Sequence, residues 1–331
     1  MDWNSPRFRN GVFHNELPTA LMSGDTSMFR TFLKFMRKPK HVNPPAPLPS
    51  VRSDLKALNG PETSVTWFGH SSYLIRMNGG NILVDPVFSS HASPVPLFAK
   101  AFPGANAYSA ADMPDIDVLI ITHNHYDHLD SRTISSLRSR IKNVYTGLGV
   151  KPDLVRCGIP AEIITEMDWG QSADLPVGLA LTAAPARHFS GRGVKRNQSL
   201  WSSYILAAET EKIYIGGDSG YGPHFKAIGE AFGPFDLAIL ETGQYNPQWA
   251  AIHMMPEEAV RAAEDLRARA LLPVHWAKFA LAFHPWDEPA QRTAAEAAKA
   301  GMPLATPRIG ETFFLHQPLP AKHWWKDVKQ P

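Results

Sequence analysis

Six consecutive residues, His123 to His128, combine three imidazoles and one carboxylate in the pattern H-x-H-x-D-H. Neutral imidazole and carboxylate are the ligands that zinc and similar divalent metals prefer. The apolar run before the motif, residues 117–122, predicts a buried strand, and residues 130–140 predict a helix. A loop between a strand and a helix holds its side chains rigidly, so the motif predicts a metal site rather than a histidine-rich surface tract.

Three further polar residues follow apolar runs later in the chain. They are His188, Asp218 and His275, and each stands just after a predicted strand. Strand ends can present side chains at a common edge of a sheet, where ligands usually bind. Four ligands in one loop could serve one ion or two, and a second ion would need ligands from such strand ends.

The composition sets the class of protein. The 331 residues include 33 basic and 31 acidic ones, and 44% are hydrophobic, which predicts a globular protein with a sizeable core. The near balance of charge disfavours a dedicated nucleic-acid binder. The single cysteine, Cys157, excludes an internal disulfide framework and fits a reducing compartment. The first residues lack the apolar region of a signal peptide, so we expect a cytoplasmic protein, at most peripheral to a membrane.

The N-terminal segment, residues 1–60, differs from the domain expected over residues 61–331. Residues 27–38 interleave aromatic and aliphatic side chains with basic ones. Two interpretations fit: a helix lying on an anionic membrane or lipid substrate, or an arm packed on the main body, which we favour. Residues 39–49 contain five prolines and predict an extended linker.

Short apolar runs bounded by Gly, Pro, Asn or Asp predict strands in the remaining chain. They cover residues 65–76, 81–84, 118–122, 179–184, 203–207, 212–215, 237–240, 271–274 and 312–315. Helices are expected between the later strands. Asp130 is a candidate N-cap for one, Pro256 opens a second, and a third runs from Pro289 to Ala300 and ends at Gly301.

The motif followed by His, Asp and His resembles the metallo-β-lactamase superfamily. This resemblance implies an α/β fold, the αββα sandwich, in which two mixed sheets pack face to face with helices outside. Several segments are similar, more closely, to the N-acylphosphatidylethanolamine-hydrolysing phospholipase D family and its bacterial relatives. These segments are 66–72, 85–88, 216–221, 232–237, 253–260 and 275–281. The N-terminal arm and the loops 89–110 and 192–198 show no such similarity, so the substrate does not follow from it.

The resemblance implies two divalent ions, with zinc expected and manganese or iron as alternatives. It assigns His123, His125 and His188 to one ion, and Asp127, His128 and His275 to the other, with Asp218 bridging both. It also places His253 beside the reacting phosphate, so Asp127, Asp218 and His253 are the expected catalytic residues. We expect Asp85 to orient the histidine loop through hydrogen bonds, and His70 either to support the ligands or to face the substrate.

Two ions about 3.5–4 Å apart can share one water and lower its pKa toward about 7, which gives a bridging hydroxide nucleophile. The leading hypothesis is therefore a hydrolase of a phosphodiester, with an N-acyl phospholipid as the candidate substrate. The alternatives are a lactonase or other ester hydrolase acting on a sugar-phosphate-like substrate, a nuclease, which the charge balance disfavours, and a non-enzymatic metal-binding or membrane-associated protein. The resemblance to lipid enzymes also makes a homodimer an expectation.

Overall fold

The computed structural model describes residues 3–22, 39–58, 60–95, 98–193 and 195–329. Within these ranges the chain forms two large sheets and a small N-terminal hairpin, β1 (Phe8–Arg9) with β2 (Val12–Phe13). The basic segment 27–38, for which membrane contact was considered, lies outside the described residues.

The first large sheet has seven strands in the described part of the chain. Their bounds are β3 (Ser64–Trp67), β4 (Tyr73–Met77), β5 (Gly80–Val84), β6 (Val118–Ile121), β7 (Val144–Gly147), β8 (Ile164–Met167) and β15 (Thr312–Phe314). The order across the sheet is β15-β3-β4-β5-β6-β7-β8. Strands β15 to β5 pair antiparallel, and β5 to β8 pair parallel, so this sheet is mixed.

The second large sheet has six strands among the described residues. Their bounds are β9 (Ser172–Leu175), β10 (Leu179–Ala184), β11 (Ser203–Ala207), β12 (Lys212–Ile215), β13 (Leu237–Glu241) and β14 (Leu271–Val274). The order is β14-β13-β12-β11-β10-β9, with parallel pairing from β12 to β14. Both sheets therefore contain a parallel part, and parallel strands end at the same edge.

Alternating residues of the strands divide between two layers of core. In β6, Val118 and Ile120 pack between the two sheets, whereas Leu119 and Ile121 pack against helices on the outer face. Side chains of the second sheet divide in the same way, with Ile239 between the sheets and Leu240 against helices. Strands buried on both faces read as continuous apolar runs, which is why the sequence signalled them clearly.

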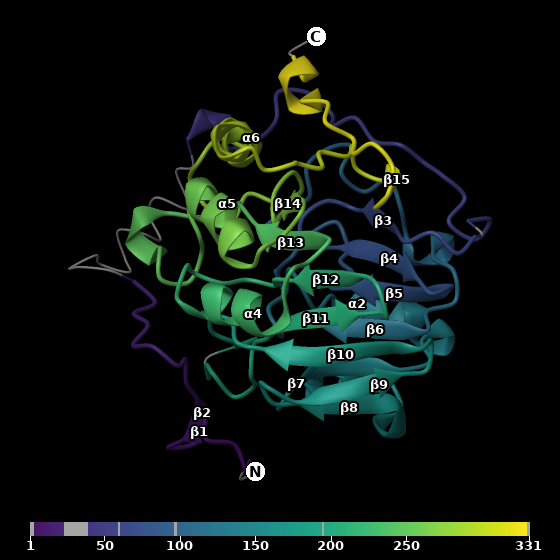
Figure 1. Ribbon diagram of the computed structural model, residues 1–331, viewed down its shortest axis with the longest axis vertical. Coiled ribbons are helices and arrows are strands. Elements are labelled where there is room, and N and C mark those ends of the chain that lie inside the picture. Colours follow the sequence, from purple (N-terminus) through teal and green to yellow (C-terminus); the bar gives the residue numbers. More distant parts are fainter. Residues whose placement is uncertain (1–2, 23–38, 59, 96–97, 194, 330–331) are drawn as a thin grey trace.

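Helices cover the outer faces of the sandwich (Figure 1). Their bounds are α2 (Ser131–Leu137), α3 (Lys151–Arg156), α4 (His224–Phe232), α5 (Pro256–Asp265) and α6 (Glu288–Ala300). Buried residues of α2 and α3 join the core on the first sheet, and those of α4 and α5 join the core on the second. Helix α6 contributes Ala297 to that outer core, and Ala290 and Ala294 to the core between the sheets. The expected αββα sandwich is thus confirmed.

Local signals placed three helix ends correctly, whereas the helix expected over residues 130–140 ends at Leu137 and continues only as a 3-10 turn over Arg138–Arg140. Asp130 caps α2 by accepting a hydrogen bond from the Arg132 amide, Pro256 occupies the first turn of α5, and α6 ends at Gly301 with φ of 68°. The single run expected over residues 65–76 was wrong, because residues 68–72 turn the chain between β3 and β4. The sequence analysis also missed β7, β8 and β9, which are short and, in β8 and β9, mix polar with apolar residues.

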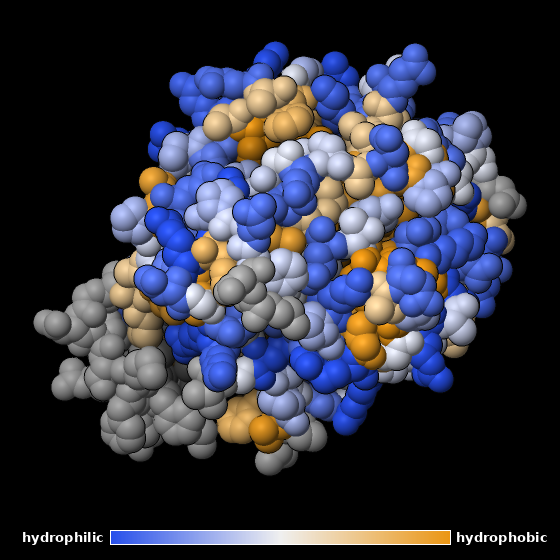
Figure 2. All heavy atoms as spheres, turned by 90° about the horizontal axis from the view of Figure 1, so that it is seen from below, coloured by the Kyte–Doolittle hydropathy of each residue, from blue (hydrophilic) through white to orange (hydrophobic). Residues whose placement is uncertain are grey.

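Described residues of the N-terminal segment, from the ranges 3–22 and 39–58, lie against the body of the protein. Phe13 is fully buried in a cluster with Trp169 and Trp201, and in the proline-rich stretch Val42 and Leu48 are also buried. The division near residue 60 stays a prediction. On the face seen from below, hydrophilic side chains surround several small apolar groups (Figure 2). Among the described helices, none has the length and apolar character that crossing a membrane requires.

Candidate metal centre

The candidate metal ligands and Asp85 lie at one edge of the sandwich because parallel strands of both sheets end there. The loop from His123 to His128 follows β6, and Asp85 follows β5 in the same sheet. Asp218 follows β12, and His275 follows β14 in the second sheet. The sequence predicted these strand ends, and the facing sheets bring them together.

Three histidines form the first group of ligand atoms. His125 Nδ1 lies 2.8 Å from His123 Nε2 and 3.2 Å from His188 Nε2. Ligand nitrogens that share a tetrahedral zinc ion at about 2.0–2.1 Å lie roughly 3.3 Å apart. The spacing of these nitrogens therefore fits one shared ion, at the residues expected to hold it.

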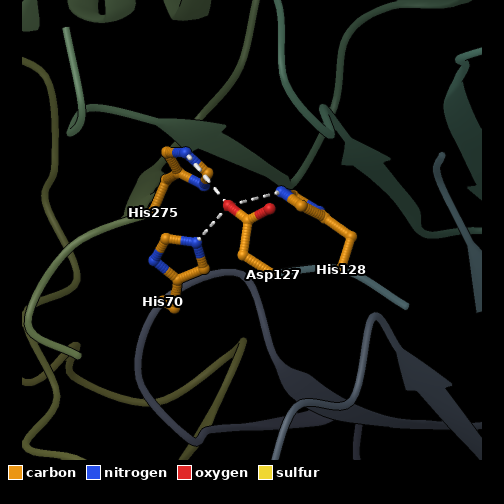
Figure 3. A group of neighbouring side chains, drawn as sticks. All are labelled: His70, Asp127, His128 and His275. Carbon is orange, nitrogen blue, oxygen red and sulfur yellow. Dashed lines mark hydrogen bonds and ion pairs between the residues drawn. The ribbon is translucent and has the colours of Figure 1, made fainter. Parts of the chain in front are cut away.

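A second group surrounds the Asp127 carboxylate (Figure 3). Asp127 Oδ2 lies 3.7 Å from His128 Nε2 and 4.0 Å from His275 Nε2. His70 Nε2 is closer, at 2.9 Å, and hydrogen-bonds to the same oxygen. This group contains the three residues expected at the second ion, and it adds His70, whose role the sequence left open.

Asp218 lies between the two groups. Its Oδ2 is 3.2 Å from His128 Nε2 and 3.7 Å from His188 Nε2, and its Oδ1 is 3.2 Å from His275 Nδ1. One carboxylate thus reaches histidines assigned to both ions. This is the position in which a bridging carboxylate would be needed.

The donor set suits divalent cations. His128 Nε2 and Asp218 Oδ1 are buried and have no hydrogen-bond partner among the described residues. Burial, reinforced by neighbouring imidazoles, lowers the pKa of His123, and burial lowers that of His125 to about 3, so both rings are neutral with a free lone pair. Burial by itself would lower the pKa of His128, but the neighbouring Asp218 carboxylate raises that pKa well above its usual value. A pocket of this kind favours a bound cation. Imidazole nitrogens and carboxylate oxygens are suitable ligands for a divalent metal ion.

Asp85 supports the histidine loop through hydrogen bonds. Its Oδ2 lies 2.7 Å from His128 Nδ1, and its two oxygens accept hydrogen bonds from the backbone amide and hydroxyl of Thr122. Bonding at Nδ1 leaves His128 Nε2 for a metal, which is the usual role of a carboxylate behind a metal-bound histidine. The role expected for Asp85 agrees with these contacts.

Three residues of the site adopt a left-handed backbone. The φ angles are 53° at His70, 41° at Asp85 and 68° at His275. Non-glycine residues seldom adopt positive φ, and such strain persists only where the surroundings enforce it. The backbone segments of His70 and His275 hold each other in this conformation, because the His275 amide donates a hydrogen bond to the His70 carbonyl at 3.0 Å.

The sequence analysis missed Glu241, the last residue of β13. This fully buried carboxylate lies 2.6 Å from His253 Nδ1 and accepts a hydrogen bond from the Ser219 amide at 2.8 Å. Burial raises the pKa of Glu241 well above its usual range. The signal was available, since Glu241 ends an apolar run as the other site residues do. His253 itself lies beside the ligands, with its ring 4.9 Å from that of His188.

A cavity of about 490 Å³ opens onto the two groups. Part of its lining comes from site residues His125, Asp127, Asp218, His253 and His275. The remainder is mainly apolar, and consists of Leu21, Met22, Phe189, Trp249, Ile252 and Leu281, together with Arg196 and Gln244. A larger cavity of about 840 Å³ is lined by Asn124 and Arg192 but by none of the candidate ligands, so we place the substrate in the smaller one.

An αββα sandwich with two facing groups of histidine and carboxylate at one edge defines a metal-dependent hydrolase of the metallo-β-lactamase fold. A family model described as "Beta-lactamase superfamily domain" matches residues 80–276. The chain therefore belongs to this superfamily, as its motifs predicted.

Known proteins show how far the similarity extends. An uncharacterized protein of Mycobacterium tuberculosis is 37% identical over 97% of this chain and 88% of its own. N-acyl-phosphatidylethanolamine-hydrolyzing phospholipase D 1 of Caenorhabditis elegans is 32% identical over 82% of each chain. The structure of Igni18, a metallo hydrolase from Ignicoccus hospitalis, aligns with a TM-score of 0.57 over 76% of this chain and 97% of its own, at 21% identity. That structural similarity supports the fold alone.

Proposed function

We propose that this metal-dependent hydrolase cleaves a phosphodiester in the manner of a phospholipase D, with an N-acylated phospholipid as its substrate. The observation that carries the proposal is the cavity, whose lining combines candidate metal ligands with many apolar side chains. Such a site suits a substrate with a phosphate at one end and hydrocarbon at the other. The similarity to the worm phospholipase supports the same substrate class.

Each group of residues has a separate task in this proposal. When bound, the two metal ions would polarise the phosphate and supply an activated water as nucleophile. The chain contributes the ligands His123, His125 and His188 on one side, and Asp127, His128 and His275 on the other, with Asp218 between them.

His253 and Arg196 would act on the substrate directly. Glu241 engages His253 Nδ1, which leaves Nε2 for a proton transfer at the leaving oxygen or a hydrogen bond to phosphate. Arg196 is exposed at the cavity, where its guanidinium stands 5.6 Å from the centre of the Phe189 ring. A cation at this position favours an anionic substrate.

The direct test combines metal analysis with an activity screen. Protein loaded with Zn²⁺, and separately with Mn²⁺ or Fe²⁺, is given N-acylphosphatidylethanolamine, phosphatidylcholine, a cyclic nucleotide and a sugar-phosphate lactone. We expect release of the N-acylethanolamine, abolished by chelation and by Asp218→Asn. If the protein hydrolysed the lactone but none of the phosphodiesters, the proposal would be overturned in favour of a lactonase.

The lipid proposal includes peripheral membrane contact through residues 27–38. Binding to vesicles containing anionic phospholipid should weaken several-fold when Phe32 and Leu33 are both changed to serine, because apolar area and basic charge together drive interfacial binding. Sedimentation with vesicles measures this. Equal binding of the variant and the unchanged protein would assign the segment a role away from the membrane.

A further inference from the structure

The side chain of Asn15 holds the backbone of His188, although their residue numbers differ by 173. Asn15 Nδ2 donates to the His188 carbonyl at 2.7 Å, and Asn15 Oδ1 accepts from the His188 amide at 3.1 Å. A side-chain amide offers a donor and an acceptor like those of a peptide group. Asn15 therefore fixes both ends of this residue, as a neighbouring strand would.

The segment around Asn15 is anchored on both sides. Before it, Phe13 is buried beside Trp201, and the Phe13 amide donates to the Asn197 carbonyl at 2.8 Å. Trp201 Nε1 also donates to Asn15 Oδ1 at 3.0 Å. After it, the Arg187 guanidinium donates to the Pro18 carbonyl and to the Thr19 hydroxyl. This arm, residues 3–22, is thus docked where it meets His188, a candidate metal ligand.

The imidazole of His188 is oriented independently of its backbone. Its Nδ1 donates to the Ile252 carbonyl at 2.9 Å, which leaves the lone pair of Nε2 directed toward His125. Asn15 fixes the main chain and Ile252 fixes the ring. Of the three histidines in the first group, His188 alone comes from outside the motif loop, so its placement depends on such contacts.

We propose that the N-terminal arm helps to form the metal centre, because Asn15 acts as a positioning residue for His188. Docking of the arm and binding of the ion at His123, His125 and His188 are then coupled. Coupling between two binding equilibria is reciprocal, so the ion stabilises the docked arm by as much as the docked arm stabilises the ion. This inference needs no assumption about which bond the enzyme hydrolyses.

Zn²⁺ affinity of three variants tests the coupling. Asn15→Ala removes all three hydrogen bonds, and Asn15→Asp keeps the acceptor but loses the donor. Leu17→Ala is the matched control, because Leu17 lies on the same arm, is 40% exposed and does not line the cavity above the ligands. In competition with a chelator, we expect Asn15→Ala to bind one ion roughly 10- to 100-fold more weakly, a typical loss when a group behind a metal ligand is removed. Asn15→Asp should be intermediate, and Leu17→Ala should match the unchanged protein.

Amide hydrogen exchange tests the reciprocal half of the coupling. Removing Zn²⁺ from the unchanged protein should accelerate exchange at the Phe13 and His14 amides, which are hydrogen-bonded in the docked arm. Unchanged Zn²⁺ affinity in a folded Asn15→Ala protein would overturn the proposal. If that variant does not fold, Asn15→Asp decides alone, since its shape is preserved, and affinity equal to that of the unchanged protein would again overturn it.

Discussion

At the scale of single residues, the metal centre is a set of groups that are costly to bury without a ligand. His188 and His275 are buried, and burial together with neighbouring imidazoles lowers their pKa well below the usual value. Asp218 is buried among them, and burial raises its pKa to about 6. Burying a charged group is costly unless it is paired, and strongly shifted pKa values gathered in one cavity are typical of a functional site.

Glu241 should affect catalysis through His253. Glu241→Gln replaces the carboxyl group that holds the His253 ring at Nδ1 with an amide, and should lower kcat roughly 100-fold, the usual contribution of a general acid or base, with a smaller effect on KM. Steady-state kinetics on the zinc-loaded variant measures this. Glu257→Gln, which changes a carboxylate bonded to Arg292, is the control and should leave both constants unchanged. Loss of zinc from Glu241→Gln, with activity restored by excess zinc, would instead make Glu241 a metal ligand.

Lys278 should make stability depend on pH. Burial lowers the pKa of this lysine from 10.5 to about 7. Below pH 7 both states carry the proton, and the folded state bears the full cost of a buried ammonium. Between pH 7 and 10.5 the unfolded state binds more protons, so this contribution makes stability rise with pH.

Lys278→Met should therefore raise the free energy of unfolding at pH 6 by a few kcal/mol, and its advantage should vanish near pH 10. The lost hydrogen bond from Nζ to the Phe68 carbonyl reduces the gain. Denaturant unfolding across this pH range measures the difference. Lys226→Met, at an exposed lysine of α4, should show no such dependence, and equal slopes for the two variants would contradict the expectation.

At the scale of elements, the site depends on how strands end and helices begin. The histidine loop is held between β6 and α2, and Asp130 fixes the start of that helix. Its Oδ1 accepts from the Arg132 amide, and its Oδ2 accepts from the Ser89 amide and the Thr133 hydroxyl. One carboxylate thus ties together the helix and the loop after β5.

Asp130→Ala should lower the free energy of unfolding by about 1–3 kcal/mol, because it removes an N-cap and leaves buried donors unpaired. Asp130→Asn keeps one acceptor oxygen and should lose less. Urea unfolding of both variants checks the order. A variant Asp130→Ala as stable as the unchanged protein would show that other contacts hold the start of α2.

At the scale of the whole molecule, the last described residues support the centre of the fold. The 3-10 helix η6 (Trp324–Asp327) inserts Trp324 against Trp276, with ring centres 5.2 Å apart, and Trp276 stacks on Trp67 of β3 at 5.4 Å. Trp276 directly follows the candidate ligand His275. The C-terminal segment and the two sheets therefore share one continuous core, which includes the residue next to His275.

Trp324→Ala should destabilise the protein by about 3–5 kcal/mol, since it leaves a large cavity in this core. Trp324→Phe keeps much of the volume and should cost less, although it loses the hydrogen bond from Nε1 to the Pro307 carbonyl. Calorimetric melting of the zinc-loaded proteins measures both. Melting temperatures equal to that of the unchanged protein would mean that the end of the chain contributes little to stability.

The candidate ligands could be inferred from the amino-acid sequence, and the fold class followed from the resemblance that their order carries. His123 to His128, His188, Asp218 and His275 each follow an apolar run, and strands buried on both faces produce runs that can be recognised locally. Caps such as Asp130 and Gly301 also act within one helical turn, so their effect can be inferred from neighbouring residues alone. Short strands such as β8 and β9 gave too weak a pattern.

The distant residues that support the site became apparent only from the folded chain. Asn15 meets His188 and Glu241 meets His253 because the chain folds back on itself, and no local periodicity reports such contacts. The same holds for His70 beside Asp127 and for the cavity wall that Leu21 and Met22 share with Trp249. Local physics fixes which groups can bind metal, whereas packing between sheets, loops and the N-terminal arm fixes what surrounds them.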